Sequence, residues 1–174
     1  MTTDKRAPVT AHLRAADIAR AVTDGDIVLA TVDVDAPPER VFRALMTDEV
    51  ERWWGAAGVY TIEAWKAVVH AGGPWSLVIR LPDGTALPAS GEFLEVQAPS
   101  KVVQTRQYDW AHPTLGRRVT KVTYLLAPIE RGTRVTIRHE DFSVSEAAYE
   151  HAGGWERFLD WLADYLKSEK GATR

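Results

Sequence analysis

A histidine and a tryptophan lie one helical turn apart near the C-terminal end of the chain. His151 and Trp155 belong to HAGGWERFLDWLADYL, whose apolar residues recur at the spacing of an amphipathic helix. Because residues four apart share a helix face, both lie on the apolar side. There His151 could donate to a ligand or act as a general acid or base. The alternative, which we favour, is a packed histidine bonded to a backbone group or a carboxylate.

Two arginines interrupt apolar stretches that alternate like β-strands. Arg106 lies in KVVQTRQY and Arg80 lies in PWSLVIRL. A guanidinium there could hold a carboxylate at a cavity, because its planar set of donors matches that group. The alternative is an arginine on the open face of the sheet, with its aliphatic stem on the strand and its charge in water. We favour the open face for both.

Aromatic residues are numerous, with seven tryptophans in 174 residues. Two of them and two tyrosines could line a pocket and stack on a flat apolar ligand: Trp75, Trp110, Tyr108 and Tyr124. They could equally fill the core, since a domain of this size needs large apolar side chains inside it. Both interpretations stay open.

Other chemistry has little support in the residue pattern. His139, Glu140 and Asp141 are adjacent, but neighbouring strand residues point to opposite faces, so His139 and Glu140 do not converge on one point. Three further histidines show no ligand spacing: His12, His70 and His112. The chain has no cysteine and no nucleophile or phosphate-binding motif. We therefore expect no metal and no cofactor, and assign no catalytic residue.

The composition is that of an ordinary globular protein. The net charge is −3, without the basic excess that neutralises phosphates, so we expect no nucleic-acid partner. No apolar run approaches the roughly 20 residues of a membrane span, and MTTDKRAPVT lacks the apolar core of a secretion signal. These features predict a soluble, cytoplasmic protein.

The elements that must position these residues follow a simple order. Residues 27–34 predict a strand, and 35–46 and 47–55 predict two short helices. Residues 59–139 contain short alternating runs separated by turn residues, which predicts an antiparallel meander. The capping pair Ser143 and Glu146 predicts a long helix that ends near residue 168.

The ends of the chain are expected to lie outside this arrangement. Leu13, Ile18, Ala21 and Val22 lie near helical spacing, which predicts a short helix in residues 10–26 with Gly25 as its stop. We divide the chain into an N-terminal extension, 1–25, a domain, 26–168, and a flexible tail, 169–174.

Two glycines fall inside the predicted long helix. A glycine in a helix interior costs about 1 kcal/mol relative to alanine, so Gly153 and Gly154 need a compensating reason. We expect them on the face nearest the sheet, where they allow close approach or leave room at a cavity. A kink between two helices is the alternative.

The element order and five segments resemble the SRPBCC superfamily, also called START-like or birch-pollen-allergen-like. Within it, the sequence resembles the family of the C-terminal domain of the activator of the ninety-kilodalton heat-shock protein ATPase. The segments are APPERVFRALMTDEVERWWG (36–55), GGPWSLVIRLPDG (72–84), GEFLEVQAPSKVVQT (91–105), GTRVTIRHEDF (132–142) and HAGGWERFLDWL (151–162).

The resemblance implies an α+β helix-grip fold, a curved antiparallel sheet wrapped around the long C-terminal helix. It also implies a cavity between the two that holds an apolar or aromatic small molecule, and we expect an enclosed, mostly apolar space of several hundred Å³. Of Trp53 and Trp54, one is expected to close the cavity mouth and the other to pack inside. The expected cavity lining is Trp54, Trp75, Arg106, Tyr108, Trp110, Tyr124, His151 and Trp155.

Two other functions stay open. One is a cyclase, aromatase or hydrolase that acts on a bound apolar substrate through His151, Tyr124 or Arg106, which requires two of these groups in one pocket. The other is a module that modulates a chaperone ATPase, which is the least expected. A homodimer is also left open, because Trp161 lies off the main apolar stripe of its helix.

Overall fold

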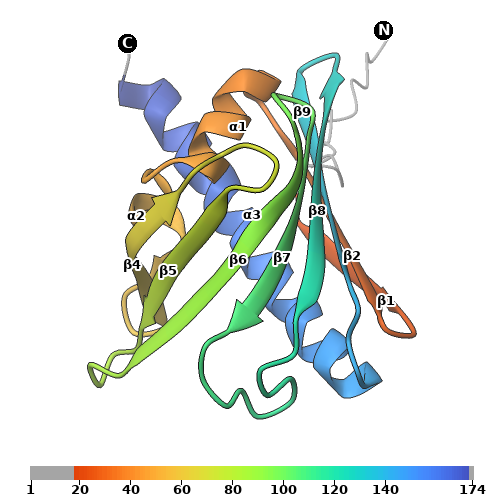
Figure 1. Ribbon diagram of the computed structural model, residues 1–174. Helices are drawn as coiled ribbons and strands as arrows, with labels where there is room; N and C mark the ends of the chain where they lie inside the picture. Colours follow the sequence, from red (N-terminus) through yellow and green to blue (C-terminus); the bar gives the residue numbers. More distant parts are fainter. Residues whose placement is uncertain (1–17, 173–174) are drawn as a thin grey trace, which may run out of the picture.

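The computed structural model describes residues 18–172 and shows one nine-stranded antiparallel sheet packed against a long helix (Figure 1). The strand order is β1-β2-β9-β8-β7-β6-β5-β4-β3. All paired strands are consecutive in the sequence except β2 and β9, which pair with each other. The α+β helix-grip fold predicted from the sequence is confirmed. The elements are β1 (Arg20–Asp24), β2 (Ile27–Val34), α1 (Pro38–Met46), α2 (Val50–Trp53), β3 (Gly55–Ala56), β4 (Tyr60–Ala67), β5 (Pro74–Arg80), β6 (Ala86–Gln97), β7 (Lys101–Tyr108), β8 (Thr120–Ile129), β9 (Gly132–Glu140) and α3 (Ser145–Ala172).

The predicted N-terminal helix is wrong for residues 20–24, which form strand β1. β1 pairs with β2 in a hairpin whose turn contains Gly25 at φ +60°. A two-residue hairpin turn with glycine at its first position matches the right-handed twist of the strands. The backbone hydrogen bonds between β1 and β2 stabilise the strand more than the weakly helical spacing of apolar residues stabilises a helix. The sheet therefore begins at Arg20. The rest of that predicted helix, residues 10–17, lies outside the described residues.

The free edge of β1 is covered by α3. The backbone amide of Ala21 donates to Glu156 at 2.9 Å, and the amide of Ala19 donates to Asp160 at 3.3 Å. Unpaired edge amides otherwise invite pairing with another chain, so these carboxylates close an exposed edge. They also join the first strand to the last helix.

The helix α3 crosses the sheet diagonally, and its C-terminal end lies beside α1 (Figure 1). It is one helix of 28 residues, about 42 Å long at 1.5 Å per residue. It includes both glycines, so the alternative of a break between two helices is wrong. It also continues past residue 168, so residues 169–172 of the predicted flexible tail are helical.

The two glycines lie in different surroundings. A Cβ atom on either would meet no atom within 4 Å, so neither allows close approach to the sheet, and that expectation is wrong. Gly153 is exposed, whereas Gly154 is half-buried and lines a pocket. Of the two glycines, therefore, only Gly154 leaves room at a cavity as expected.

The core lies between α3 and the concave face of the sheet. On β8 the buried residues are Thr120, Val122, Tyr124 and Leu126, two apart as in a sheet with one covered face. β7 and β9 alternate in the same way. Among residues 18–172, no helix is both long enough and apolar enough to span a membrane.

Candidate functional site

A pocket lies where β7, β4, the residue after α2 and the middle of α3 meet. An inner cavity of about 70 Å³ adjoins an outer pocket of about 210 Å³, and six residues line both. The inner cavity is lined by Trp54, Tyr60, Arg106, Tyr108, His151, Gly154, Trp155 and Phe158. Because Gly154 has no side chain, α3 leaves the pocket open along that part of its length.

Arg106 is the charged group in the interior of the pocket. Its side chain shares the buried face of β7 with Val102, Gln104 and Tyr108, and it is 6% exposed. Its Nε and Nη1 atoms are buried without a hydrogen-bond partner. Within residues 18–172, no carboxylate forms an ion pair with it. The guanidinium cannot lose its proton, so a full positive charge stays unpaired there.

Aromatic rings surround this charge. The guanidinium carbon lies 5.3–5.9 Å from the ring centres of Trp54, Trp75, Tyr108 and Trp155. Each cation–π contact contributes roughly 0.5–2 kcal/mol. Burying an ion costs several kcal/mol even after the protein relaxes. The rings therefore offset part of the desolvation cost of Arg106, and its Nε and Nη1 donors remain without a partner.

His151 and Tyr108 form a hydrogen-bonded pair at the pocket wall. His151 Nδ1 lies 2.7 Å from the backbone oxygen of Ala147, which can only accept, so this nitrogen carries the proton. His151 Nε2 then accepts from the Tyr108 hydroxyl at 3.1 Å. Burial, together with the smaller effect of the Arg106 charge, lowers the pKa of His151 to about 4. The imidazole is neutral at neutral pH.

His139 is hydrogen-bonded to Trp155, which lines the inner cavity. Its Nδ1 accepts from the indole N–H of Trp155 at 3.0 Å, so its Nε2 donates to the Thr120 hydroxyl at 2.7 Å. Thr120 in turn donates to the backbone oxygen of Arg106 at 3.1 Å. Burial places the pKa of His139 well below its usual range. This chain of bonds fixes Trp155 and the β7 backbone at Arg106 relative to each other.

The mouth of the pocket carries groups of both charges. Glu150, Arg157 and His112 line the outer pocket, and Glu150 and Arg157 are exposed. Burial lowers the pKa of His112, which stacks on Tyr108 with ring centres 4.5 Å apart. The pocket can therefore hold a small planar molecule that enters past polar groups and meets rings and one cation inside. Among residues 18–172, no cluster of three or more histidine or acidic side chains is arranged to hold a metal.

A family model describes most of the same chain. Residues 35–167 match the model "Activator of Hsp90 ATPase homolog 1-like protein". The chain belongs to this family. The match begins after β2 and ends within α3, so the Activator of Hsp90 ATPase homolog 1-like region contains every residue that lines the pocket. The resemblance stated from the sequence is confirmed.

Solved structures show the same fold. A protein from Rhodobacter sphaeroides has 20% identity and a TM-score of 0.72, over 86% of this chain and 99% of its own. A protein from Chromobacterium violaceum has 22% identity and a TM-score of 0.72, over 81% and 96%. The AHSA1 protein from Silicibacter pomeroyi has 24% identity and a TM-score of 0.68, over 82% and 99%. No curated protein matches the chain significantly.

The structure brings five of the eight residues expected from the sequence to the inner cavity of this Activator of Hsp90 ATPase homolog 1-like domain: Trp54, Arg106, Tyr108, His151 and Trp155. The other three do not line it. The Trp75 ring centre lies 5.9 Å from the Arg106 guanidinium carbon, and Tyr124 packs edge-on against Trp155. Trp110 packs against Tyr108 and His112 near the mouth. For these three, the interpretation as packing residues fits.

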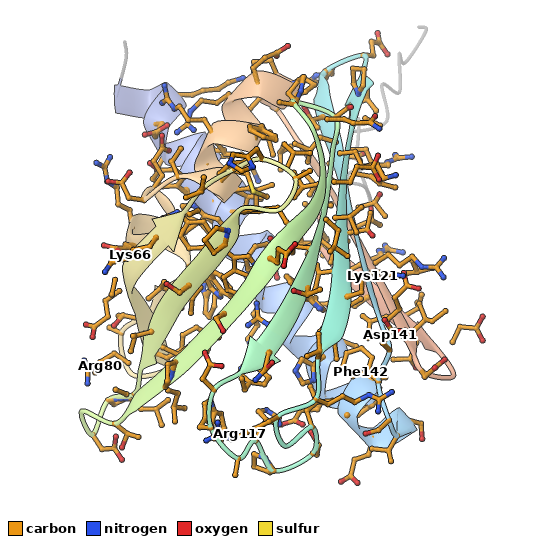
Figure 2. All side chains as sticks on the ribbon, in the orientation of Figure 1. Lys66, Arg80, Arg117, Lys121, Asp141 and Phe142 are labelled. Atoms are coloured by element: carbon orange, nitrogen blue, oxygen red, sulfur yellow. The ribbon has the colours of Figure 1, made fainter. Side chains whose placement is uncertain are left out.

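The open-face interpretation holds for only one of the two arginines, Arg80 and Arg106. Arg80 lies at the outer margin of the sheet, as Figure 2 shows, and pairs with Glu63, so the open-face interpretation is confirmed for it. For Arg106 that interpretation is wrong. The alternation of KVVQTRQY explains why Arg106 is buried. Arg106 shares a strand face with Val102 and Tyr108, whereas the other face is mostly polar.

Three lining residues were missed. Tyr60 and Phe158 were assigned to no site, and Gly154 was expected to leave room at a cavity but was not among the predicted lining residues. Phe158 lies one turn after Gly154 on α3, so its helical spacing from His151 and Trp155 was an available signal. Trp161 packs edge-on against Tyr60 with ring centres 5.6 Å apart, so the chain itself partly covers it. The homodimer stays a prediction.

The expected enclosed, mostly apolar cavity of several hundred Å³ differs from what residues 18–172 form. Both pockets open to the surface, and the inner one is about 70 Å³. Large rings occupy the remaining space, because Phe158 packs on Trp53, Trp54 and Trp155 with ring centres 4.9–5.0 Å apart. Trp53 packs inside and Trp54 lines the pocket, in the division of roles that the resemblance implies.

Proposed function

We propose that this domain binds a small molecule with a planar apolar part in the pocket between β7 and α3. The observation that carries the proposal is the adjoining pair of cavities, about 70 and 210 Å³, both lined by Gly154 of α3. Trp54, Trp155 and Phe158 contact the apolar part of the ligand. Arg106 and the Tyr108–His151 pair contact its polar part.

Gly153 and Gly154 provide a matched test of this pocket. Gly154→Leu places a side chain where the pocket now opens, whereas Gly153→Leu places the same side chain in solvent. Both changes remove a helix glycine, so both raise helix propensity by roughly 0.5–1 kcal/mol. We expect Gly154→Leu to weaken ligand binding at least tenfold and Gly153→Leu to leave it within twofold.

The measurement uses benzoate, 2-naphthoate and their neutral amides, with isothermal titration calorimetry and quenching of tryptophan fluorescence. Trp54 and Trp155 are the tryptophans that line the inner cavity, which makes their fluorescence a local reporter. The proposal fails if none of the four compounds binds the wild-type protein. It also fails if the two leucine variants bind them equally well.

Proton-transfer chemistry on the bound molecule is the second candidate function. It is favoured by the convergence of Arg106 and His151 on one pocket, with the Tyr108 hydroxyl bonded to His151 Nε2. A pKa of about 4 makes His151 a weak base, so binding remains the first proposal. Turnover would appear as a new product when the ligand is analysed by chromatography and mass spectrometry after incubation with the protein.

A third function is suggested by the family name alone. The name refers to activation of an Hsp90 ATPase, and the pocket geometry does not bear on that activity. A chaperone partner is therefore not proposed.

A further inference from the structure

We propose that the ligand of this pocket is a planar aromatic monocarboxylate whose carboxylate binds Arg106. The inference rests on the proposed binding function and adds the chemical class of the ligand. It starts from the contrast between Arg106 and the other arginines with described ion pairs. Five arginines each contact a carboxylate of the chain, and each is more exposed than Arg106: Arg40, Arg43, Arg80, Arg134 and Arg138.

The side chain of Arg106 borders a place where a ligand fits. Its Nε and Nη1 atoms are buried without partners, and the side chain lines both the inner and the outer pocket. A cavity needs roughly 10–15 Å³ to hold one water molecule. The inner cavity of about 70 Å³ therefore admits a group of several non-hydrogen atoms, such as a carboxylate.

The charge of the pocket selects an anion. Arg106 carries the only formal charge among the residues that line the inner cavity, because His151 is neutral and the others are aromatic or glycine. A carboxylate accepts charge-assisted hydrogen bonds from guanidinium N–H groups, which are about twice as strong as neutral ones. A neutral ligand would leave the buried charge without a counter-ion.

The rings select a planar body. The ring centres of Trp54 and Trp155 lie 5.5 and 5.9 Å from the Arg106 guanidinium carbon, and Tyr60 and Phe158 are also part of the inner lining. Trp54 also donates its indole N–H to the Tyr60 hydroxyl at 3.2 Å, so its ring is held in place. With the carboxylate on Arg106, which lines both pockets, the ring system packs among these rings and extends into the outer pocket of about 210 Å³ beneath Gly154.

The test compares carboxylates with amides of the same shape. In the wild-type protein we expect benzoate and 2-naphthoate to bind at least tenfold more tightly than benzamide and 2-naphthamide. Arg106→Met keeps an unbranched apolar side chain and removes the charge, and we expect it to reduce this preference below threefold while naphthamide still binds. Arg80→Met, the same change at an arginine outside both pockets, keeps the full preference.

The outcomes separate the two proposals. If no compound binds the wild-type protein, the proposed function itself fails. If acids and amides bind equally, the binding function stands and the carboxylate is wrong. A preference for the acids that survives in Arg106→Met would place the anion elsewhere and would also overturn the inference. Arg106→Gln repeats the test with a polar side chain, with circular dichroism to verify the fold of each variant.

Discussion

At the scale of the residue, Arg106 combines two properties that rarely occur together. It is 6% exposed, and two of its nitrogen atoms have no hydrogen-bond partner. Buried charges are ordinarily paired, because desolvation penalises the charged form strongly. A residue that lowers stability in this way and lies in a pocket fits a binding role better than a structural one. Cation–π contacts with its neighbours Trp54 and Trp155 offset only part of the desolvation cost of Arg106.

Arg106→Met should therefore stabilise the protein in the absence of ligand. We expect the free energy of unfolding to rise by about 1–3 kcal/mol, because the variant removes an unpaired buried charge and keeps most of the packing. Urea denaturation followed by circular dichroism measures this change. A lower free energy of unfolding would mean that the four cation–π contacts exceed the desolvation cost, and that Arg106 has a structural role.

At the scale of the element, a carboxylate joins the two short helices to the last one. Glu49 is buried between α1 and α2 and accepts from Arg40 Nη2 and Arg43 Nε, each at 2.8 Å, and from the Tyr165 hydroxyl at 3.0 Å. Arg40 also pairs with Glu169 near the C-terminal end of α3. These contacts hold the α1–α2 segment on α3, and Trp54 follows directly after α2. The pocket wall thus depends on contacts made at the other end of the helix.

Glu49→Gln should weaken that connection. We expect the free energy of unfolding to fall by about 2 kcal/mol, because three hydrogen bonds lose their charged acceptor and two arginines lose a counter-ion. Thermal and urea unfolding measure the loss. Glu130→Gln, which changes an exposed carboxylate in the β8–β9 turn, should stay within ~0.5 kcal/mol of the wild-type protein. Equal effects of the two variants would show that Glu49 does not hold the helices together.

At the scale of the whole molecule, folding buries two neutral histidines against the same cation. His151 faces Arg106, His112, Glu150 and the Tyr108 hydroxyl, and His139 faces Arg106 and His151. Burial lowers the pKa of both below the ordinary histidine value of 6.5, to about 4 for His151. Between pH 6.5 and 4 the unfolded chain therefore binds more protons than the folded one. Stability rises with pH in this window and is lost as the pH falls.

The free energy of unfolding should fall by about 3 kcal/mol from the His151 contribution alone as the pH drops from 7 to 4. Urea unfolding at a series of pH values measures the slope. His151→Gln should show a smaller slope than the wild-type protein, whereas His70→Gln, a change on the exposed β4–β5 loop, should keep it. An unchanged slope in His151→Gln would contradict the lowered pKa.

Local patterns in the sequence determine most of the architecture. The two-residue alternation of β7, β8 and β9 and the helical spacing of α3 are properties of short segments, so the strands, the long helix and their order followed from the residues alone. The family followed from the same segments. The hairpin β1–β2 did not, because the weak helical spacing of Ala21 and Val22 competes with a ladder that only a paired β2 can supply.

Only the tertiary structure decided the site. Strand alternation places Arg106 on one face with Tyr108, but whether that face meets α3 or water depends on sheet curvature and on how the helix lies across it. The size of the pocket likewise depends on rings from distant segments, since Trp54, Tyr60 and Phe158 meet only after folding. Gly153 and Gly154 are equivalent in the sequence, and the rotation of α3 alone makes one a surface residue and the other part of the pocket opening.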